Sequence, residues 1–198
     1  VSNNFNHLDE LPQGARVGSC SLRRIVQIKS IRPDLTMLDL RGNVNTRLIK
    51  LDNDKYDAII LACAGLIRLG LENRITKTID AQTCLPAVGQ GALGIEIRKD
   101  DNDVKELIAP LIDIKTTTTV LAERAMNARL EGGCSVPIAG YATIDGEELT
   151  LQGMVGNVQS GEILRAKSTG STSESKVLGE SVANKLITMG AKALLENA

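Results

Sequence analysis

Apolar residues in the first 85 positions form short runs that alternate with segments of helical spacing. Three runs are predicted strands: residues 15–19, 35–40 and 56–63. Three further segments are predicted helices: residues 21–33, 44–52 and 64–70. Pro33 closes the first helix, Asn43 is a candidate N-cap of the second, and Gly70 suits the end of the third. The third run, YDAIILAC, is almost continuously apolar, as expected for a parallel strand buried on both faces. The alternation predicts an α/β domain with a largely parallel sheet.

The pattern changes after Pro86. Residues 91–98, GALGIEIR, are predicted as another strand, followed by a helix that Pro110 breaks. A helix over 118–133 is expected to be capped by a Thr near position 118 and stopped by two glycines. Three apolar runs follow, separated by the hairpin signals Asp145-Gly146 and Ser160-Gly161; they cover residues 138–144, 148–156 and 162–168. A Ser/Thr/Gly-rich loop over 168–175 and one last helix, 176–196, complete a predicted α+β half with a three-stranded antiparallel sheet. The domain break is expected between about 86 and 115.

Composition removes several function classes. A net charge of −1, two Tyr, one Phe and no Trp argue against nucleic-acid binding. No apolar run approaches the roughly 20 residues that span a bilayer. The N-terminus has neither the basic start nor the apolar centre of a signal peptide, and it lacks an initiator Met. We therefore expect a cytoplasmic chain that begins partway through a longer protein.

The four cysteines and the single histidine, His7, are scattered along the chain. There is no CxxC pair, so the spacing argues against a zinc site and against a histidine-based catalytic triad. We expect no bound metal. Thiols dispersed in this way favour a reducing compartment.

Arginines recur where predicted strands end and helices begin. Arg23 and Arg24 lie in a first helical turn, Arg41 follows the second strand, Arg47 lies one turn into the next helix, and Arg68 follows the third strand. Positive charge in a first turn opposes the helix dipole by ~0.3–1 kcal/mol, a penalty that a bound anion would reverse. Ligands of open α/β sheets bind at these strand ends. The recurrence predicts a polyanion site.

A plainer interpretation exists for each arginine taken singly. A first-turn arginine is most often a solvated surface charge, and Arg68 also suits the C-terminal end of its helix. The guanidinium fork fits carboxylate and phosphate equally well, and the sequence has no phosphate-binding P-loop. The pattern alone therefore leaves the chemistry of the anion open.

The stretch LEGGCSVP, residues 130–137, places Cys134 behind two glycines. A lone cysteine is most often a small buried hydrophobe. The glycines, however, leave space beside the sulfur that a bulky attached group could occupy. Cys20, Cys63 and Cys84 have no comparable setting, and Cys63 is expected to belong to the core.

Six segments together resemble one known family, the hydroxymethylbilane synthases, also called porphobilinogen deaminases. These segments are VGSCSLRR, LRGNVNTRL, YDAIILACAGLIRLG, LPAVGQGALGIEIR, AERAMNARLEGGCSVPI and DGEELTLQGMVG. They occur in the family's order and span about residues 15 to 156. The resemblance implies that Cys134 holds a dipyrromethane cofactor through a thioether. It also implies head-to-tail condensation of four porphobilinogens with release of ammonia, then hydrolysis to hydroxymethylbilane.

The resemblance implies roles for the strand-end residues, because the growing pyrrole chain is a polycarboxylate. Cofactor carboxylates are assigned to Ser19, Ser21, Arg23, Arg24 and Arg47. Substrate carboxylates are assigned to Arg41, Arg47 and Arg68. Cys20 stands where serine is frequent in the family.

The family's N-terminal domain, which carries its catalytic aspartate and a substrate-binding lysine, has no counterpart here. No catalytic residue is therefore assigned, and Asp39, Asp57 and Asp80 are expected to be structural or exposed. The resemblance implies a periplasmic-binding-protein-like α/β domain over 1–86, a return segment of the otherwise missing domain over 87–112, and a small α+β domain over 113–198. We expect the chain alone to be inactive and the full-length protein to be an active monomer whose substrate is porphobilinogen.

One alternative from another class remains. The α/β part could belong to a noncatalytic binding protein or regulator that captures a small anion between two lobes. That interpretation explains the arginines equally well, but not the LEGGC loop. A covalent pyrrole on Cys134 distinguishes the two.

Overall fold

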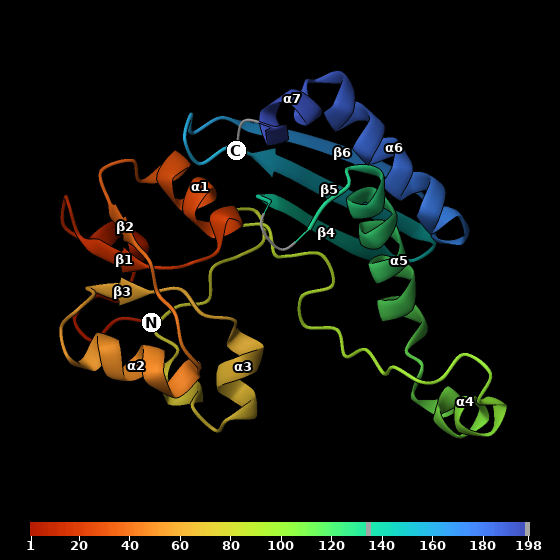
Figure 1. The fold of residues 1–198 in the computed structure, drawn as a ribbon, viewed down its shortest axis with the longest axis horizontal. Helices are drawn as coiled ribbons and strands as arrows, with labels where there is room; N and C mark the ends of the chain where they lie inside the picture. The colour runs from red at the N-terminus through yellow and green to blue at the C-terminus, as the bar shows by residue number, and fades with distance from the viewer. Residues whose placement is uncertain (134–135, 197–198) are drawn as a thin grey trace.

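A computed structural model describes residues 1–133 and 136–196. The chain forms two units, each built on its own three-stranded sheet (Figure 1). The first sheet contains β1 (Arg16–Gly18), β2 (Thr36–Leu38) and β3 (Ala58–Ile59). Its helices are α1 (Leu22–Ile31), α2 (Val44–Asp52) and α3 (Cys63–Arg68), with single 3₁₀ turns at Leu8–Glu10 and Glu72–Arg74.

The first unit has the predicted α/β architecture. The strand order is β2-β1-β3, and both pairings are parallel, with Val17 opposite Met37 and Ala58. Asn43 caps α2 as predicted, since its side-chain oxygen accepts a hydrogen bond from the Thr46 amide at 2.8 Å. Gly70 ends α3 with a φ of +68°. Each strand is followed by a helix, so the helix N-termini and the residues just before them gather at one sheet edge.

The prediction of a long strand over 56–63, buried on both faces, is wrong. Only Ala58 and Ile59 form β3, and only Ile59 of the run is buried. Leu61 leads directly into α3, and residues 58–64 line a cavity on one side of the strand. Cys63 is accordingly not a core residue; it is half-buried at the start of α3.

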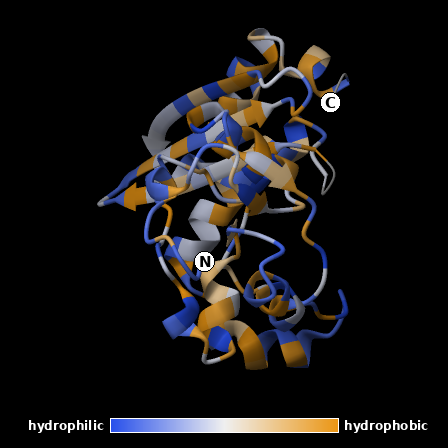
Figure 2. Ribbon diagram, turned by 90° about the vertical axis from the view of Figure 1, so that its left-hand side faces the viewer, coloured by the Kyte–Doolittle hydropathy of each residue, from blue (hydrophilic) through white to orange (hydrophobic). Residues whose placement is uncertain are grey.

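The second unit has the predicted antiparallel sheet. Its strands are β4 (Ile138–Asp145), β5 (Glu148–Gly156) and β6 (Ile163–Ser171), in the order β4-β5-β6. Its helices are α5 (Ile114–Arg129), α6 (Ser175–Thr188) and α7 (Ala191–Glu196), with a 3₁₀ turn at Thr172–Glu174. Gly146 and Gly161 take positive φ in the two hairpin turns. Buried and solvent-facing positions alternate over the first half of β5, as in a sheet covered on one face. Figure 2 colours the ribbon by hydropathy and shows hydrophobic and hydrophilic residues mixed along the strands.

Three boundaries in this unit differ from the prediction. α5 begins at Ile114, because Asp113 rather than a Thr near 118 accepts the capping hydrogen bond from the Thr116 amide. β6 continues to Ser171 through a stretch that was predicted as loop, since its backbone pairs with β5 as far as Glu148. The predicted helix 176–196 is divided into α6 and α7 at Gly190, whose φ of +103° is incompatible with a continuous helix.

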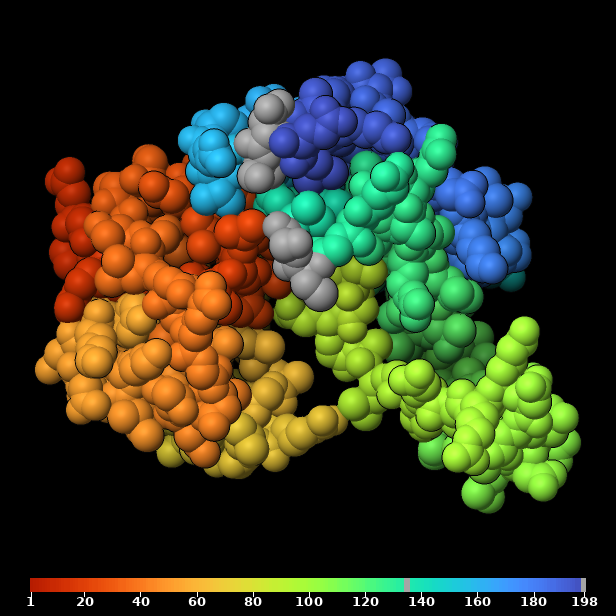
Figure 3. Space-filling model, in the orientation of Figure 1, coloured from red at the N-terminus to blue at the C-terminus, as the bar shows by residue number. Residues whose placement is uncertain are grey.

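Residues 91–112 project away from both units, and α4 (Asn102–Ile108) lies at the far end (Figures 1 and 3). The predicted strand over 91–98 is not formed, because no neighbouring strand in the described residues supplies a hydrogen-bonding partner. Leu93 and Ile95 are 78% and 56% exposed. The predicted break at Pro110 is confirmed, since α4 ends at Ile108 and a 3₁₀ turn, Ala109–Leu111, follows.

The two units meet in a small buried cluster. Val26 of α1 packs with Leu85, Ala139 of β4 and Met154 of β5, each at most 1% exposed. A Cβ placed on Gly156 would lie 2.8 Å from Val26 Cγ1, so the close approach of α1 to β5 requires glycine there. This contact fixes the C-terminal sheet beside the helix that carries Arg23 and Arg24.

Candidate functional site

Arg24 and Arg47 each donate one hydrogen bond to a backbone carbonyl at the sheet edge and form no ion pair with a described residue. Arg24 Nη1 donates to the Ile60 carbonyl at 3.0 Å, and Arg47 Nε donates to the Gly42 carbonyl at 2.7 Å. Their remaining N–H groups have no protein acceptor within the described residues. Burial lowers the pKa of Arg24, and the nearby charge of Arg47 lowers it further. A bound carboxylate would offset this repulsion between the two guanidinium charges.

Other arginines of the same unit show the contrast. Four of them form ion pairs with carboxylates: Arg16 with Asp57, Arg32 with Asp34, Arg41 with Asp39, and Arg74 with Asp52. In the described part of the chain, Arg23, Arg24, Arg47 and Arg68 have no such partner. Guanidinium groups that the fold leaves unpaired at strand ends are available to bind an anion.

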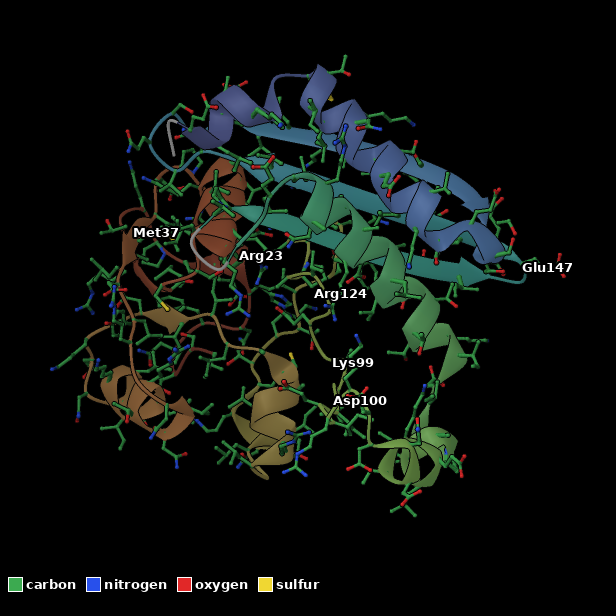
Figure 4. The ribbon with its side chains drawn as sticks, turned by 45° about the vertical axis from the view of Figure 1, so that its right-hand side comes forward. Arg23, Met37, Lys99, Asp100, Arg124 and Glu147 are labelled. Atoms are coloured by element: carbon green, nitrogen blue, oxygen red, sulfur yellow. The ribbon has the colours of Figure 1, made fainter. Side chains whose placement is uncertain are left out.

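Arg23, the neighbour of Arg24, is directed differently. It is only 7% exposed, and its guanidinium donates to the Leu85 carbonyl at 2.8 Å and to Gln90 Oε1 at 3.2 Å. Burial, with the adjacent charge of Arg24, lowers the pKa of Arg23 to about 10. Figure 4 labels Arg23 beneath α1, on the side facing the C-terminal unit. The Arg23 side chain still borders the cavity described below, but two of its N–H groups already donate hydrogen bonds within the protein.

Arg41 and Arg68 lie farther out. Arg41 is 82% exposed and pairs with Asp39, so its charge is already compensated. Arg68 is the last residue of α3 and is exposed, a position that also favours the negative end of the helix dipole. The structure does not bring Arg68 or Arg41 into the cavity that Arg24 borders.

Ser19 and Ser21 shape the turn between β1 and α1. Ser19 is buried, and its hydroxyl accepts a hydrogen bond from the Ser21 amide at 3.2 Å. Ser21 occupies the N-cap position of α1, yet its hydroxyl makes no capping hydrogen bond. Among the described residues the Ser21 hydroxyl has no hydrogen-bond partner, whereas that of Ser19 has a structural contact.

A cavity of about 400 Å³ adjoins this edge, and most of it was not anticipated from the sequence. Its lining combines apolar residues along β3 with Arg23, Arg24, Cys63 and Cys84. Burial raises the pKa of the Cys84 thiol, so that thiol stays protonated at neutral pH. The aspartates behave as expected: Asp39 and Asp57 form ion pairs, and Asp80 accepts the Thr83 amide at 2.7 Å.

Cys134, the predicted attachment point of a cofactor, lies outside the described residues. The two glycines before it have different environments. A Cβ on Gly132 would clash with the Asn127 side chain and lie 2.9 Å from Ile138 Cδ1, so a larger residue there would displace neighbouring side chains. A Cβ on Gly133 would meet open space. Only Gly133 thus agrees with the interpretation that bare backbone leaves room for an attached group.

No group of three or more His, Cys, Asp or Glu side chains in residues 1–133 and 136–196 could hold a metal ion. Every helix in those ranges is too short or too polar to span a bilayer. The structure is thus an α/β unit joined to an α+β unit, with guanidinium groups at the edge of the parallel sheet that have no carboxylate partner among the described residues.

Comparison with known proteins identifies the family. A family model described as "Porphobilinogen deaminase, dipyromethane cofactor binding domain" matches residues 1–106, and one described as "Porphobilinogen deaminase, C-terminal domain" matches residues 117–188. Porphobilinogen deaminases of Ruthia magnifica and Vesicomyosocius okutanii are 62% and 59% identical to the chain over 197 residues. The chain belongs to the porphobilinogen deaminase family. It is matched over its whole length but spans 65% of the length of each of these two relatives.

Proposed function

We propose that the complete protein is a hydroxymethylbilane synthase, that is, a porphobilinogen deaminase. It joins four porphobilinogens head to tail with release of ammonia and hydrolyses the product to hydroxymethylbilane. The observation that carries the proposal is the pair Arg24 and Arg47, whose guanidinium groups lack carboxylate partners within the described residues. Porphobilinogen bears an acetate and a propionate group, and these carboxylates can form charge-assisted hydrogen bonds with guanidinium groups, which a neutral ligand cannot.

The residues present fit a dipyrromethane cofactor. Its carboxylates match the free N–H groups of Arg24 and Arg47 and the free hydroxyl of Ser21, and open space adjoins Gly133. We assign Cys134 as the covalent attachment point. When bound, the cofactor supplies the anchor to which porphobilinogen units are joined. Ser19 shapes the loop that presents Ser21, and Arg23 borders the same cavity, whereas Arg41 and Arg68 would meet substrate carboxylates at the outer rim.

The domain organisation is part of the proposal. Residues 1–86 form the α/β domain, which we take to be periplasmic-binding-protein-like, and residues 113–198 form the cofactor-bearing domain. Residues 87–112 belong to a further domain, most of which this chain does not contain. Exposed Leu93 and Ile95 support this, since apolar side chains at alternate positions would be buried by an adjoining sheet. The complete protein is proposed to act as a cytoplasmic monomer.

Intact-mass spectrometry tests the cofactor assignment directly. The purified chain is compared with a Cys134→Ser variant. An added mass of two substituted pyrroles, absent from the variant, supports Cys134 as the attachment point. If neither carries an adduct, the measurement is repeated after adding the remaining third of a relative. Continued absence of the adduct would then overturn the assignment.

The anion site is tested in a complete protein made by joining this chain to that remaining third. Arg24→Leu or Arg47→Leu is expected to reduce cofactor assembly or chain elongation by at least about tenfold, while folding is largely kept. Arg129→Leu is the control, because Arg129 is exposed on α5 in the other unit. Unchanged turnover in the Arg24 and Arg47 variants would count against the site. The chain alone is expected to consume no porphobilinogen.

A further inference from the structure

Gln27 is a fully buried polar side chain that the proposed site does not use. It lies on α1 one turn after Arg23 and is 0% exposed. Its Oε1 accepts from the Leu85 amide at 2.9 Å and from Arg165 Nη2 at 3.3 Å. Its Nε2 donates to the carbonyls of Arg23 and Leu85, both at 3.1 Å. Burying a primary amide is costly unless all of these hydrogen bonds form, so the side chain is held in one orientation.

Leu85 receives an unusual set of partners. Both of its backbone groups bond to side chains of α1: Gln27 takes the amide, and Gln27 and Arg23 share the carbonyl. Its own side chain is buried in the cluster that joins the two units. The side-chain amide of Gln27 therefore pairs with both the N–H and the C=O of Leu85, as the backbone of a neighbouring strand would in a sheet.

The position of the Arg23 guanidinium depends on this arrangement. Its Nη1 bonds to Leu85, and its Nη2 bonds to Gln90 five residues farther along the same segment. Arg165 reaches the same glutamine from β6 of the C-terminal unit. Gln27 thus contacts α1, the connecting segment and the C-terminal sheet at one point.

We propose that Gln27 is a positioning residue that fixes Leu85, and through it Arg23, beside Arg24, and that couples this edge to the C-terminal sheet through Arg165. The importance of that geometry for carboxylate binding rests on the proposed function. The effect of Gln27 on the position of Arg23 does not rest on the proposed function, and it can be measured without ligand.

Modification of arginines by phenylglyoxal, followed by peptide mass spectrometry of the 198-residue chain, measures the geometry. Exposed Arg41 is the internal reference, and the readout is the ratio of the Arg23 rate to the Arg41 rate. Gln27→Met keeps the length of the side chain but removes every hydrogen bond, so the ratio should rise about tenfold as the segment opens locally. Gln27→Glu retains both acceptor contacts and should raise the ratio only roughly threefold. Gln82→Leu, an exposed glutamine just before the segment, should leave it unchanged.

Two further variants separate positioning from general stability. Arg165→Met should also raise the Arg23 ratio, and combining it with Gln27→Met should add little, because both act through one contact. Leu151→Ala weakens the C-terminal core without touching Gln27, and it should leave the ratio unchanged wherever circular dichroism shows the chain folded. If Arg23 remains as protected in folded Gln27→Met as in the wild type, or if Leu151→Ala exposes it equally, the proposal is overturned.

The same labelling separates this proposal from the proposed function. Porphobilinogen at millimolar concentration should protect Arg24 and Arg47 from phenylglyoxal. If it protects neither, the carboxylate site is wrong, while the ligand-free Arg23 ratios still decide whether Gln27 fixes that side chain.

Discussion

The two units differ in the interactions that stabilise their folds. The sheet of the α/β unit has strands of only three, three and two residues, whereas the strands of the C-terminal sheet have eight, nine and nine. In the C-terminal unit, α5 and α6 pack against one another and against the sheet around a single large cluster. The α/β unit divides its core between two smaller clusters. Hydrophobic burial therefore dominates in one unit and is shared with polar contacts in the other.

Charged side chains complete the α/β unit. Arg16 holds Asp57 through two side-chain hydrogen bonds and the Arg16 amide, and Arg32 binds the carbonyls of Leu8 and Leu11. These contacts secure loops that short strands cannot hold. Because the strands are short, turns and guanidinium groups without carboxylate partners lie at the sheet edge. This edge is where the proposed site lies. The C-terminal unit has the more continuous core. Its sheet packs against α1 and so helps to position the proposed site, but it supplies none of the arginines assigned to that site.

The largest difference between the units should appear in leucine truncation. Leu151→Ala removes a fully buried side chain from the large cluster and should cost about 4 kcal/mol of unfolding free energy. Leu48→Ala, in a cluster of five buried residues, should cost about 2 kcal/mol. Urea unfolding followed by circular dichroism measures both. Leu121→Ala, already 38% exposed on α5, is the control and should cost less than about 1 kcal/mol. Equal losses at positions 151 and 48 would contradict the comparison.

Replacing a helical glycine by alanine should change the stability of the protein in opposite directions in the two units. A Cβ on Gly179 of α6 would clash with the Ala122 carbonyl of α5 and lie 2.7 Å from Ala125 Cβ, so Gly179→Ala should destabilise the protein by about 2 kcal/mol. Gly65 of α3 has its nearest neighbour, Val44 Cγ2, 3.9 Å away. Gly65→Ala should therefore stabilise the protein by up to about 1 kcal/mol through helix propensity. Thermal midpoints of the two variants check the prediction, and a stabilised Gly179→Ala would show that the helices are not in close contact.

The two units should also respond oppositely to pH. The hydrogen bonds from Arg16 lower the pKa of Asp57, so its stabilising contribution is present above its ordinary value of 3.8 and is lost as the pH falls. Burial raises the pKa of Glu123, although it accepts the Gly89 and Ala142 amides at 2.7 and 2.9 Å. The stabilising contribution of Glu123 is therefore complete below its ordinary pKa of 4.5 and is lost as the pH rises through the raised pKa.

Unfolding free energies between pH 3 and pH 7 test these signs. Relative to Asp57→Asn, the wild type should gain stability as the pH rises, reaching about 1 kcal/mol at neutrality, because the Asp57 side chain is 28% exposed and partly screened. Relative to Glu123→Gln, the wild type should lose stability over the same interval. Parallel pH profiles for the two variants would exclude the assigned causes.

The sequence predicted what depends on neighbours along the chain. Helical spacing, the Asn43 cap and the Asp145-Gly146 turn were correct, because each is decided within a few residues. The strand over 91–98 was wrong because a strand requires a partner, which the described residues do not supply. Arginines could be placed at strand ends, but their partners could not. The Arg23 contact with Leu85 spans 62 positions, and the role of Gln27 depends on Arg165, 138 positions away.

The start of α5 gives the smallest predicted effect and tests a local error. Asp113 Oδ1 accepts the Thr116 amide at 2.7 Å, and hydrogen bonds from the Thr116 side chain and amide lower the pKa of Asp113. Asp113→Ala should speed hydrogen exchange of the Thr116 amide roughly threefold at neutral pH, and the difference should shrink once acid protonates the wild-type carboxylate. Thr118→Ala, at the position favoured from the sequence, should leave that exchange unchanged. The reverse order would restore the threonine as the cap. Because the first turn of α5 follows the projecting segment and is exposed, neither substitution should alter the unfolding of the C-terminal core, where Leu151 would have its large effect.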